Sequence, residues 1–203
     1  MTAVTMVATA RATFAVDIAA ERAQAARELL TELGATISGP EALVMDDAGV
    51  DAAAPFVAES DGLLIHVCAS FCDAEPARRL YADAGRPVLL WAFREPGPVG
   101  ARLWLNSLCG ANLIGHALVR DGGAVRLVYG DPDEPEVRTI LADALAGRLP
   151  EAPALPQGPR GPVDAEAADQ ALASLRGQVV GAVGDAPRGF TPSEFSPEVL
   201  EDL

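Results

Sequence analysis

Residues 62–68, Gly62-Leu63-Leu64-Ile65-His66-Val67-Cys68, form the stretch that decides the fold. The run is apolar except for His66, as is typical of a strand buried on both faces of a parallel sheet. A second apolar run, PVLLWAF at 87–93, follows a helical stretch at about 73–84. Apolar strands that alternate with helices predict an α/β fold with a mostly parallel sheet.

The same alternation extends in both directions from these two strands. In chain order, the other expected elements are a strand at 13–19, a helix at 21–33, a weak strand at 35–37 or 42–45, a helix at 50–59, a helix at 111–119, a strand at 124–129 and a helix at 134–146. Five strands joined by right-handed connections predict a doubly wound, flavodoxin-like sheet with strand order 2-1-3-4-5.

The chain divides into four predicted parts. They are a disordered leader at 1–11, the flavodoxin-like domain at 12–149, a Pro- and Gly-rich linker at 150–162, and a helix with the first strand of an incomplete second α/β domain at 163–203. In the last part we expect the helix at 164–175 and the strand at 178–185. A lone strand needs a sheet, so we expect a chain that is truncated or completed by another chain. The alternative is that this strand joins the edge of the first sheet.

The net charge and the cysteine content indicate which binding partners and which cellular compartment to expect. The 203 residues carry a formal net charge of -14, which repels nucleic-acid backbones and anionic membranes, so we expect neither as a partner. The three cysteines do not make a disulfide framework. No basic region precedes an apolar core near the N-terminus, as it would in a signal peptide. We therefore expect a cytoplasmic protein.

Several familiar site motifs are missing. The loop after the first predicted strand has no G-x-G-x-x-G motif and the chain has no P-loop, which argues against dinucleotides and nucleoside triphosphates. His66, Cys68 and Cys72 lack a fourth ligand, so we predict no metal site and expect buried structural residues there. His116 is expected to pack on a helix surface, and the acidic turn at 131–134 is expected to cap a helix.

The long segment at 94–109 is the best candidate for a functional loop, because such long connections in a compact domain are usually functional or disordered. Trp91, Arg94, Arg102 and Trp104 lie in or beside it, in a chain with only 5% aromatic residues. Indole faces and planar guanidinium groups suit sugar hydroxyls and carboxylates. The alternative is an ordinary packed connection.

Four segments around and beyond this loop resemble a known family. They are PVLLWAFREPG at 87–97, LNSLCG at 105–110, YGDPDEPEV at 129–137 and VGAVGDAPRGF at 180–190. In this order they resemble the N-terminal domain of the L-fucose/L-arabinose isomerase family, especially its bacterial fucose isomerase-like members. The last segment is similar to the first strand and loop of that family's second domain. The chain departs from the family at Ser193 and Phe195, where a Cys and a Tyr are usual.

The resemblance implies a part in carbohydrate metabolism, through aldose–ketose isomerisation with a bound divalent metal, typically manganese. The family's Glu, Asp and His ligands come from later domains, so we expect no cofactor and no catalytic residue in this chain, and no activity from it alone. It further implies a first-domain role in a homo-oligomer, or with a missing C-terminal partner. The sugar would be touched by rim residues, for which we predict Trp91, Arg94 and Asn106.

Two other interpretations remain open from the sequence. The chain could be a stand-alone flavodoxin-like module that binds a small ligand near Asp17 and Ser70, beyond the carboxyl ends of the strands. It could also be a structural, oligomer-forming protein without catalysis.

Overall fold

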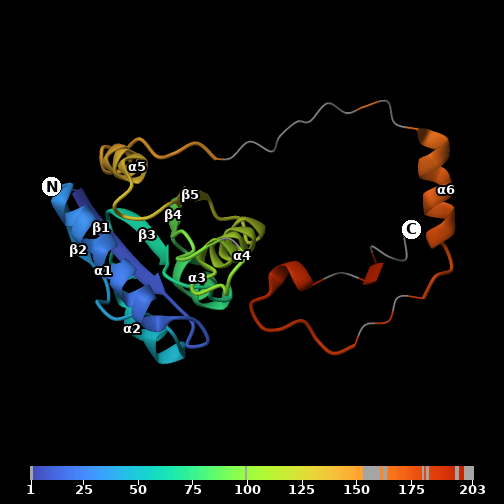
Figure 1. Ribbon diagram of the computed structural model, residues 1–203, viewed down its shortest axis with the longest axis horizontal. Coiled ribbons are helices and arrows are strands. Elements are labelled where there is room, and N and C mark those ends of the chain that lie inside the picture. The colour runs from blue at the N-terminus through green and yellow to red at the C-terminus, as the bar shows by residue number, and fades with distance from the viewer. Residues whose placement is uncertain are drawn as a thin grey trace.

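The computed structural model describes residues 2–98, 100–152, 161, 164–179, 181, 183–194 and 197–198 of the chain. A five-stranded sheet with the order β2-β1-β3-β4-β5 forms its centre (Figure 1). Every neighbouring pair of strands in this sheet is parallel. The doubly wound α/β fold and the flavodoxin-like strand order are therefore confirmed.

All strands of the sheet except β1 lie where the sequence predicted them. The five strands are β1 (Thr2–Thr9), β2 (Ala35–Ser38), β3 (Leu63–Cys68), β4 (Val88–Ala92) and β5 (Val125–Tyr129). β2 occupies the first of its two predicted positions, while the second position supplies only an isolated bridge between Val44 and Thr9. β3 lies between β1 and β4, and its His66 is in register with Val7 of β1 on one side and with Leu90 of β4 on the other.

The first strand was predicted wrongly. β1 occupies most of the expected disordered leader at 1–11, and the expected strand at 13–19 is instead a loop and the first turn of α1 (Val16–Glu32). The reason is that Thr5 and Thr9 look polar in sequence but are buried in β1. The hydroxyl of Thr5 hydrogen-bonds with Ser38 at 2.9 Å, and that of Thr9 with His66 at 3.0 Å, so burial leaves neither hydroxyl unsatisfied.

Two helices cover one face of the sheet. These are α1 and α5 (Pro135–Leu145), and their apolar stripes join the side chains of one sheet face in a single core cluster. α1 places Leu29 and Leu30 in this cluster, and α5 places Leu141 there. Gly34 ends α1 with a φ of 87°, which a residue with a Cβ adopts only with strain.

Three helices cover the other face. They are α2 (Asp47–Ala58), α3 (Glu75–Tyr81) and α4 (Ser107–Arg120), and they share a second core cluster with the opposite sheet face. Asp46 begins α2 by accepting a hydrogen bond from Gly49 N at 2.8 Å. In the part of the chain that the structure describes, no helix combines the length and apolar character of a membrane span.

The C-terminal part follows the prediction only in its helix. α6 (Ala165–Leu175) is present, begins at the N-cap Asp164 and has every residue exposed. The described residues of the predicted strand at 178–185 form no strand, whereas 180 and 182 lie outside the described residues, as does most of the predicted linker. Val179 and Val183 are 95% and 100% exposed. A strand needs a neighbour for its backbone hydrogen bonds, and no strand among the described residues pairs with Val179 or Val183.

Candidate functional site

The loops after β1 and β3 meet at the carboxyl edge of the sheet. The chain runs outward in opposite directions from these two central strands, and in doubly wound sheets ligands bind at such a point. Backbone contacts tie the two loops together: Ala69 N donates to Thr9 O at 2.9 Å, and Arg11 N donates to Ser70 Oγ at 3.0 Å. Ser70, named for the alternative small-ligand module, is fully buried, and its hydroxyl accepts this hydrogen bond.

Aromatic and charged side chains surround this point. The rings of Phe14 and Phe71 lie 5.7 Å apart, and the exposed Arg11 lies close to Cys72. Burial raises the pKa of the Cys72 thiol to about 12, with a further increase from Asp73, although Arg11 acts in the opposite direction. Cys72 is therefore a thiol at neutral pH rather than a nucleophilic thiolate.

The long loop after β4 folds back over the same point. The carboxylate of Glu95 accepts hydrogen bonds from the backbone N–H groups of three successive residues, with Leu105 at 2.9 Å, Asn106 at 2.8 Å and Trp104 as the third. Leu105 O then accepts from Phe71 N at 2.7 Å. This connection is thus an ordered structure held by Glu95, which sequence analysis did not single out.

The three predicted sugar-binding residues lie in different surroundings. Trp91 is fully buried and donates from Nε1 to Gly130 O at 2.8 Å, so its ring belongs to the core. Arg94 pairs with both oxygens of Glu134, at 2.6 and 2.7 Å, above the ring of Tyr129. Asn106 is half-buried in the left-handed conformation at the start of α4. Asp17, named for the alternative module, is exposed in the first turn of α1.

His66 lies inside the domain. Its Nε2 is 3.0 Å from Thr9 Oγ1 and its Nδ1 is 3.2 Å from the hydroxyl of Tyr81, and all three groups are buried. Burial lowers the pKa of His66 to about 4, so the ring is neutral at physiological pH. Within the described ranges, no three His, Cys, Asp or Glu side chains come together in a way that could hold a metal ion.

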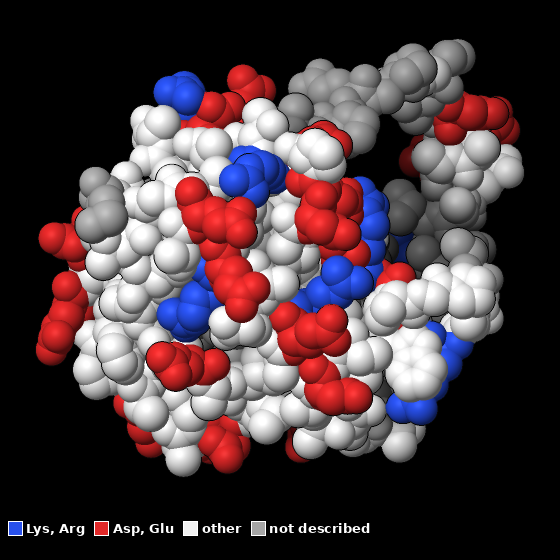
Figure 2. All heavy atoms as spheres, turned by 60° about the vertical axis from the view of Figure 1, so that its left-hand side comes forward, with Lys and Arg blue, Asp and Glu red and all other residues white. Residues whose placement is uncertain are grey.

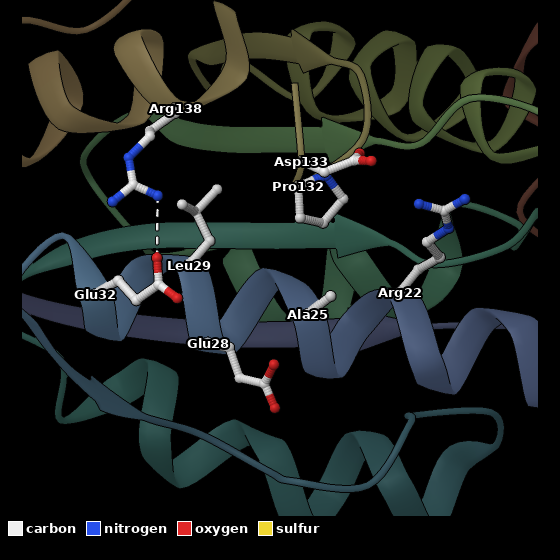
Figure 3. A pocket seen from close by; sticks show the side chains of 8 residues that line it. All are labelled: Arg22, Ala25, Glu28, Leu29, Glu32, Pro132, Asp133 and Arg138. Carbon is white, nitrogen blue, oxygen red and sulfur yellow. Dashed lines mark hydrogen bonds and ion pairs between the residues drawn. The ribbon is translucent and has the colours of Figure 1, made fainter. Parts of the chain in front are cut away.

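A charged groove of about 370 Å³ lies between α1 and the turn before α5 (Figure 3). Arg138 pairs across it with Glu32 at 3.0 Å, and Arg22 pairs with Asp131 at 3.4 Å. Both of its arginines are thus paired within the protein, whereas Glu28 and Asp133 of the lining form no ion pair with the described residues. Figure 2 shows acidic side chains spread over the face of the molecule that it draws, with fewer basic ones among them. With both arginines paired, the groove has no free cation in the lining that the structure describes for an anionic ligand.

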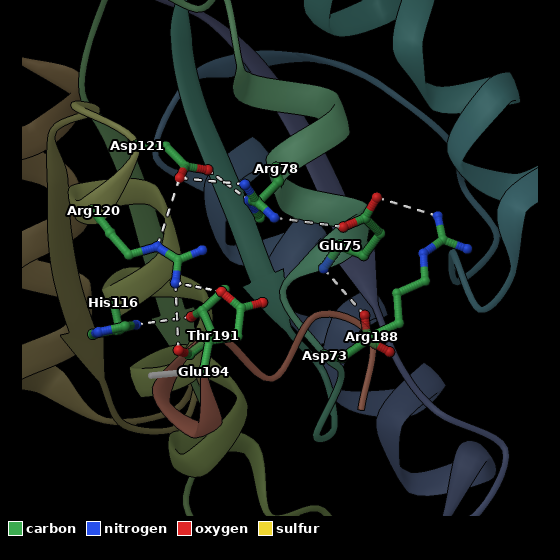
Figure 4. Close-up of polar contacts among 9 residues, drawn as sticks. All are labelled: Asp73, Glu75, Arg78, His116, Arg120, Asp121, Arg188, Thr191 and Glu194. Atoms are coloured by element: carbon green, nitrogen blue, oxygen red, sulfur yellow. Dashed lines mark hydrogen bonds and ion pairs between the residues drawn. The ribbon is translucent and has the colours of Figure 1, made fainter. Parts of the chain in front are cut away.

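A C-terminal strap, residues 187–194, packs against α3 and α4 at the carboxyl edge (Figure 4). Gly189 O accepts from Ala74 N at 3.2 Å. Gly189 has a φ of 77°, and a Cβ at this residue would lie 2.6 Å from Asp73 Oδ1, so only glycine fits. The buried Thr191 places its hydroxyl 2.8 Å from His116 Nδ1. His116 therefore anchors the strap, a role that a surface histidine in sequence does not reveal.

Ion pairs hold both ends of the strap. Arg188 pairs with Glu75 of α3 at 3.2 Å, and Glu194 pairs with Arg120 of α4 at 2.7 Å (Figure 4). Between them, the ring of Phe190 lies 5.7 Å from that of Phe71. The sequence led us to expect residues 187–190 in a second domain, so their contact with the first domain was not predicted.

A pocket of about 290 Å³ lies where the strap meets α4. Asn112 and His116 are four residues apart on α4 and so face the same side of the helix. They provide polar groups beside the apolar rings of Phe71 and Phe190. The full lining is Phe71, Cys109, Asn112, Leu113, His116, Phe190, Pro192 and Ser193. This pocket adjoins the loop after β3, where ligands of doubly wound sheets bind.

No family model matches the chain. Curated relatives do match it: sulfoquinovose isomerases from Priestia aryabhattai and Priestia megaterium are each 30% identical over 204 residues, which cover 98% of this chain and 40% of each relative. A sulfoquinovose isomerase from Alkalicoccus urumqiensis is 33% identical over 132 residues, or 65% of this chain and 29% of the relative. The chain is similar to sulfoquinovose isomerases.

This similarity has a defined extent. The chain spans about 40% of the length of the Priestia sulfoquinovose isomerases, and the match covers both the sheet domain and the strap. Sulfoquinovose isomerases are sugar isomerases by name. The similarity to them supports the predicted relation of this chain to sugar isomerases and to carbohydrate metabolism. The finer assignment to the L-fucose/L-arabinose isomerase family stays a prediction.

Proposed function

We propose that this chain is the sugar-binding N-terminal part of an aldose–ketose isomerase whose substrate is sulfoquinovose or a closely related hexose. The observation that carries the proposal is the pocket between α4 and the strap, in a chain that matches sulfoquinovose isomerases over 98% of its length. The pocket is close to the lower end of the about 300–1,000 Å³ that ligand pockets usually enclose, which suits a single sugar ring.

The pocket lining has the mixture of groups that a sugar requires. The rings of Phe71 and Phe190 offer apolar surface to the C–H face of a pyranose, while the amide of Asn112 and the imidazole of His116 can bond hydroxyl groups. Thr191 lies at Nδ1 of His116, and no hydrogen bond from the described residues engages Nε2, which we therefore assign to the ligand. The sulfonate of sulfoquinovose is an anion that a guanidinium group would favour, and our candidate is the exposed Arg11, which lies close to Cys72 in the loop after β3.

The chemical step needs groups from outside the described residues. The related sugar isomerases suggested by the sequence use a divalent metal, but no group of three His, Cys, Asp or Glu side chains among the described residues fits one. We therefore assign no step of the reaction to a metal held by this chain. Its proposed part is to bind and orient the sugar, and activity depends on polypeptide that supplies the metal ligands and the base.

Sugar binding can be measured through Cys109. Of the three cysteines, Cys68 and Cys72 are buried, and only Cys109 is exposed, in the wall of the pocket. Millimolar sulfoquinovose is expected to slow alkylation of Cys109 by iodoacetamide several-fold, as followed by intact mass. Asn112→Ala should remove this protection, and Gln24→Ala, on the exposed surface of α1, should retain it. An alkylation rate that the sugar leaves unchanged would show that the pocket is not its site.

A chimera can test whether isomerase activity depends on polypeptide beyond this chain. We expect that the chain alone, with manganese and sulfoquinovose, forms no ketose detectable by NMR. A chimera in which this chain replaces the matched region of the Priestia megaterium sulfoquinovose isomerase is expected to form it. Asn112→Ala in the chimera should raise KM about tenfold, equivalent to the loss of about 1.4 kcal/mol of binding. Ketose formation by the chain alone, or a folded but inactive chimera, would contradict the proposal.

A further inference from the structure

A second groove, of about 580 Å³, opens on the other side of His116, between α4 and the edge strand β5. Leu90, Val125 and Leu127 line it from the sheet, and Val119, which is 56% exposed, lines it from α4. Gly115 adds no side chain to the groove, although a Cβ there would make only ordinary contact with Leu90 Cδ1, at 3.4 Å. The groove is thus an apolar surface that the described part of the chain leaves uncovered.

α6 has an apolar face that matches the apolar character of this groove. Ala168, Ala171, Leu172 and Leu175 recur at helical spacing and form one stripe. Leu172 is 40% exposed and Leu175 is 56% exposed, and α6 buries none of its residues. Helices of fewer than about 12–15 residues are marginal in water without tertiary packing. At 11 residues, α6 needs a surface to pack on.

The groove is continuous with the interface between α4 and the strap. His116 and Arg120 border the groove and also hold the strap, through Thr191 and Glu194. The strap follows α6 in the chain, so its contacts with α4 limit how far α6 can lie from that helix. Residues 176–187 can span about 40 Å when extended, and residues 150–163, which follow the core contact of Leu149, about 45 Å, at roughly 3.3 Å per residue. Figure 1 shows α6 apart from the sheet, on the side of the view where α4 lies.

We propose that α6 packs its Leu172–Leu175 stripe into the α4–β5 groove of its own chain. Attachment at both ends gives α6 a high effective concentration at this groove, which favours the same chain over a second copy. Packing there would bury the stripe of α6, cover Val119 and protect the edge strand β5, which pairs only with β4 in the described sheet. The inference does not depend on sugar binding or on isomerase activity.

Disulfide trapping tests this contact. In a Cys109→Ser background, Val119→Cys is combined with Leu172→Cys on the stripe or, as a matched control, with Asp169→Cys, which lies off it. After mild oxidation, the Leu172→Cys pair is expected to form an intramolecular disulfide at least about tenfold faster than the Asp169→Cys pair. The readouts are the migration of a monomer on a non-reducing gel and the linked peptide by mass spectrometry.

A second measurement uses chains without added cysteines. With α6 packed, Leu172→Asp together with Leu175→Asp is expected to speed tryptic cleavage after Arg176 about tenfold, whereas Gln170→Asp should leave the rate unchanged. Equal trapping rates for the two cysteine pairs, covalent dimers in place of monomers, or equal cleavage of all three chains would each overturn the proposal. Because none of these readouts involves a sugar, their failure is distinct from failure of the proposed function.

Discussion

Deletion of residues 1–11 is expected to leave the chain unfolded. These residues contain β1, which lies between β2 and β3 and hydrogen-bonds with both. β1 also buries Val4, Met6 and Val7 in the two core clusters. Burying each such side chain is worth about 1.5–3 kcal/mol, and domains are stable by only about 5–15 kcal/mol. Loss of the strand therefore exceeds what the domain can tolerate.

The measurement is circular dichroism with urea titration of the full and shortened chains. Point variants within β1 show whether the loss of its buried side chains, rather than the shortening of the chain, prevents folding. Val7→Asp places a charge at a fully buried position and should also prevent folding, whereas Thr2→Asp changes an exposed residue and should cost little. A shortened chain that still unfolds cooperatively would show that β1 is dispensable, as the sequence-based expectation of a disordered leader implies.

Acidification is expected to destabilise the domain through His66. The pKa of His66 is about 4 in the folded protein, against 6.5 in the unfolded chain. Between these values the unfolded chain binds a proton that the folded protein does not, so the free energy of unfolding falls as the pH is lowered from about 6.5 to about 4. The contribution is about 2.5 kcal/mol between pH 7 and pH 4.5, at about 1.4 kcal/mol per pKa unit.

Urea titrations at the two pH values separate His66 from the carboxylates that also titrate there. His66→Asn should start from lower stability at pH 7 but should lose about 2.5 kcal/mol less than the natural chain on acidification. His116→Gln provides the comparison, because it changes the chain's other histidine, which is exposed. If His66→Asn and the natural chain lose the same stability, then His66 does not carry this pH dependence.

The sequence predicted most of this fold because its strands are short and buried. β3 and β4 lie within the two apolar runs at 62–68 and 87–93, and α1 ends at Glu32, next to the predicted end of the helix at 21–33. β1 escaped prediction because the role of Thr5 and Thr9 depends on partners far away in sequence. Thr9 meets His66 only after β1 and β3 have paired. A polar residue whose partner lies that far along the chain looks like surface in any local window.

The candidate site was harder to predict for the same reason. Trp91 stood out as a rare aromatic residue, but it pairs with Gly130 in the core. Arg94 stood out as a loop cation, but Glu134 satisfies it. The groups around the pocket come from the loop after β3, from α4 and from the strap, so no local motif contains them. Gly189 and Phe190 did attract notice through the family resemblance, although their contact with Asp73 and Phe71 needed the structure.

The central position of β1 also has a consequence for synthesis. A ribosome releases the N-terminus first, so β1 emerges before either of its neighbours and cannot bury both its edges until residue 68 is outside the exit tunnel. From then on, each new strand joins an existing edge of the sheet, because β4 adds to β3 and β5 adds to β4. The sheet can therefore be completed during translation in the order in which its remaining strands appear.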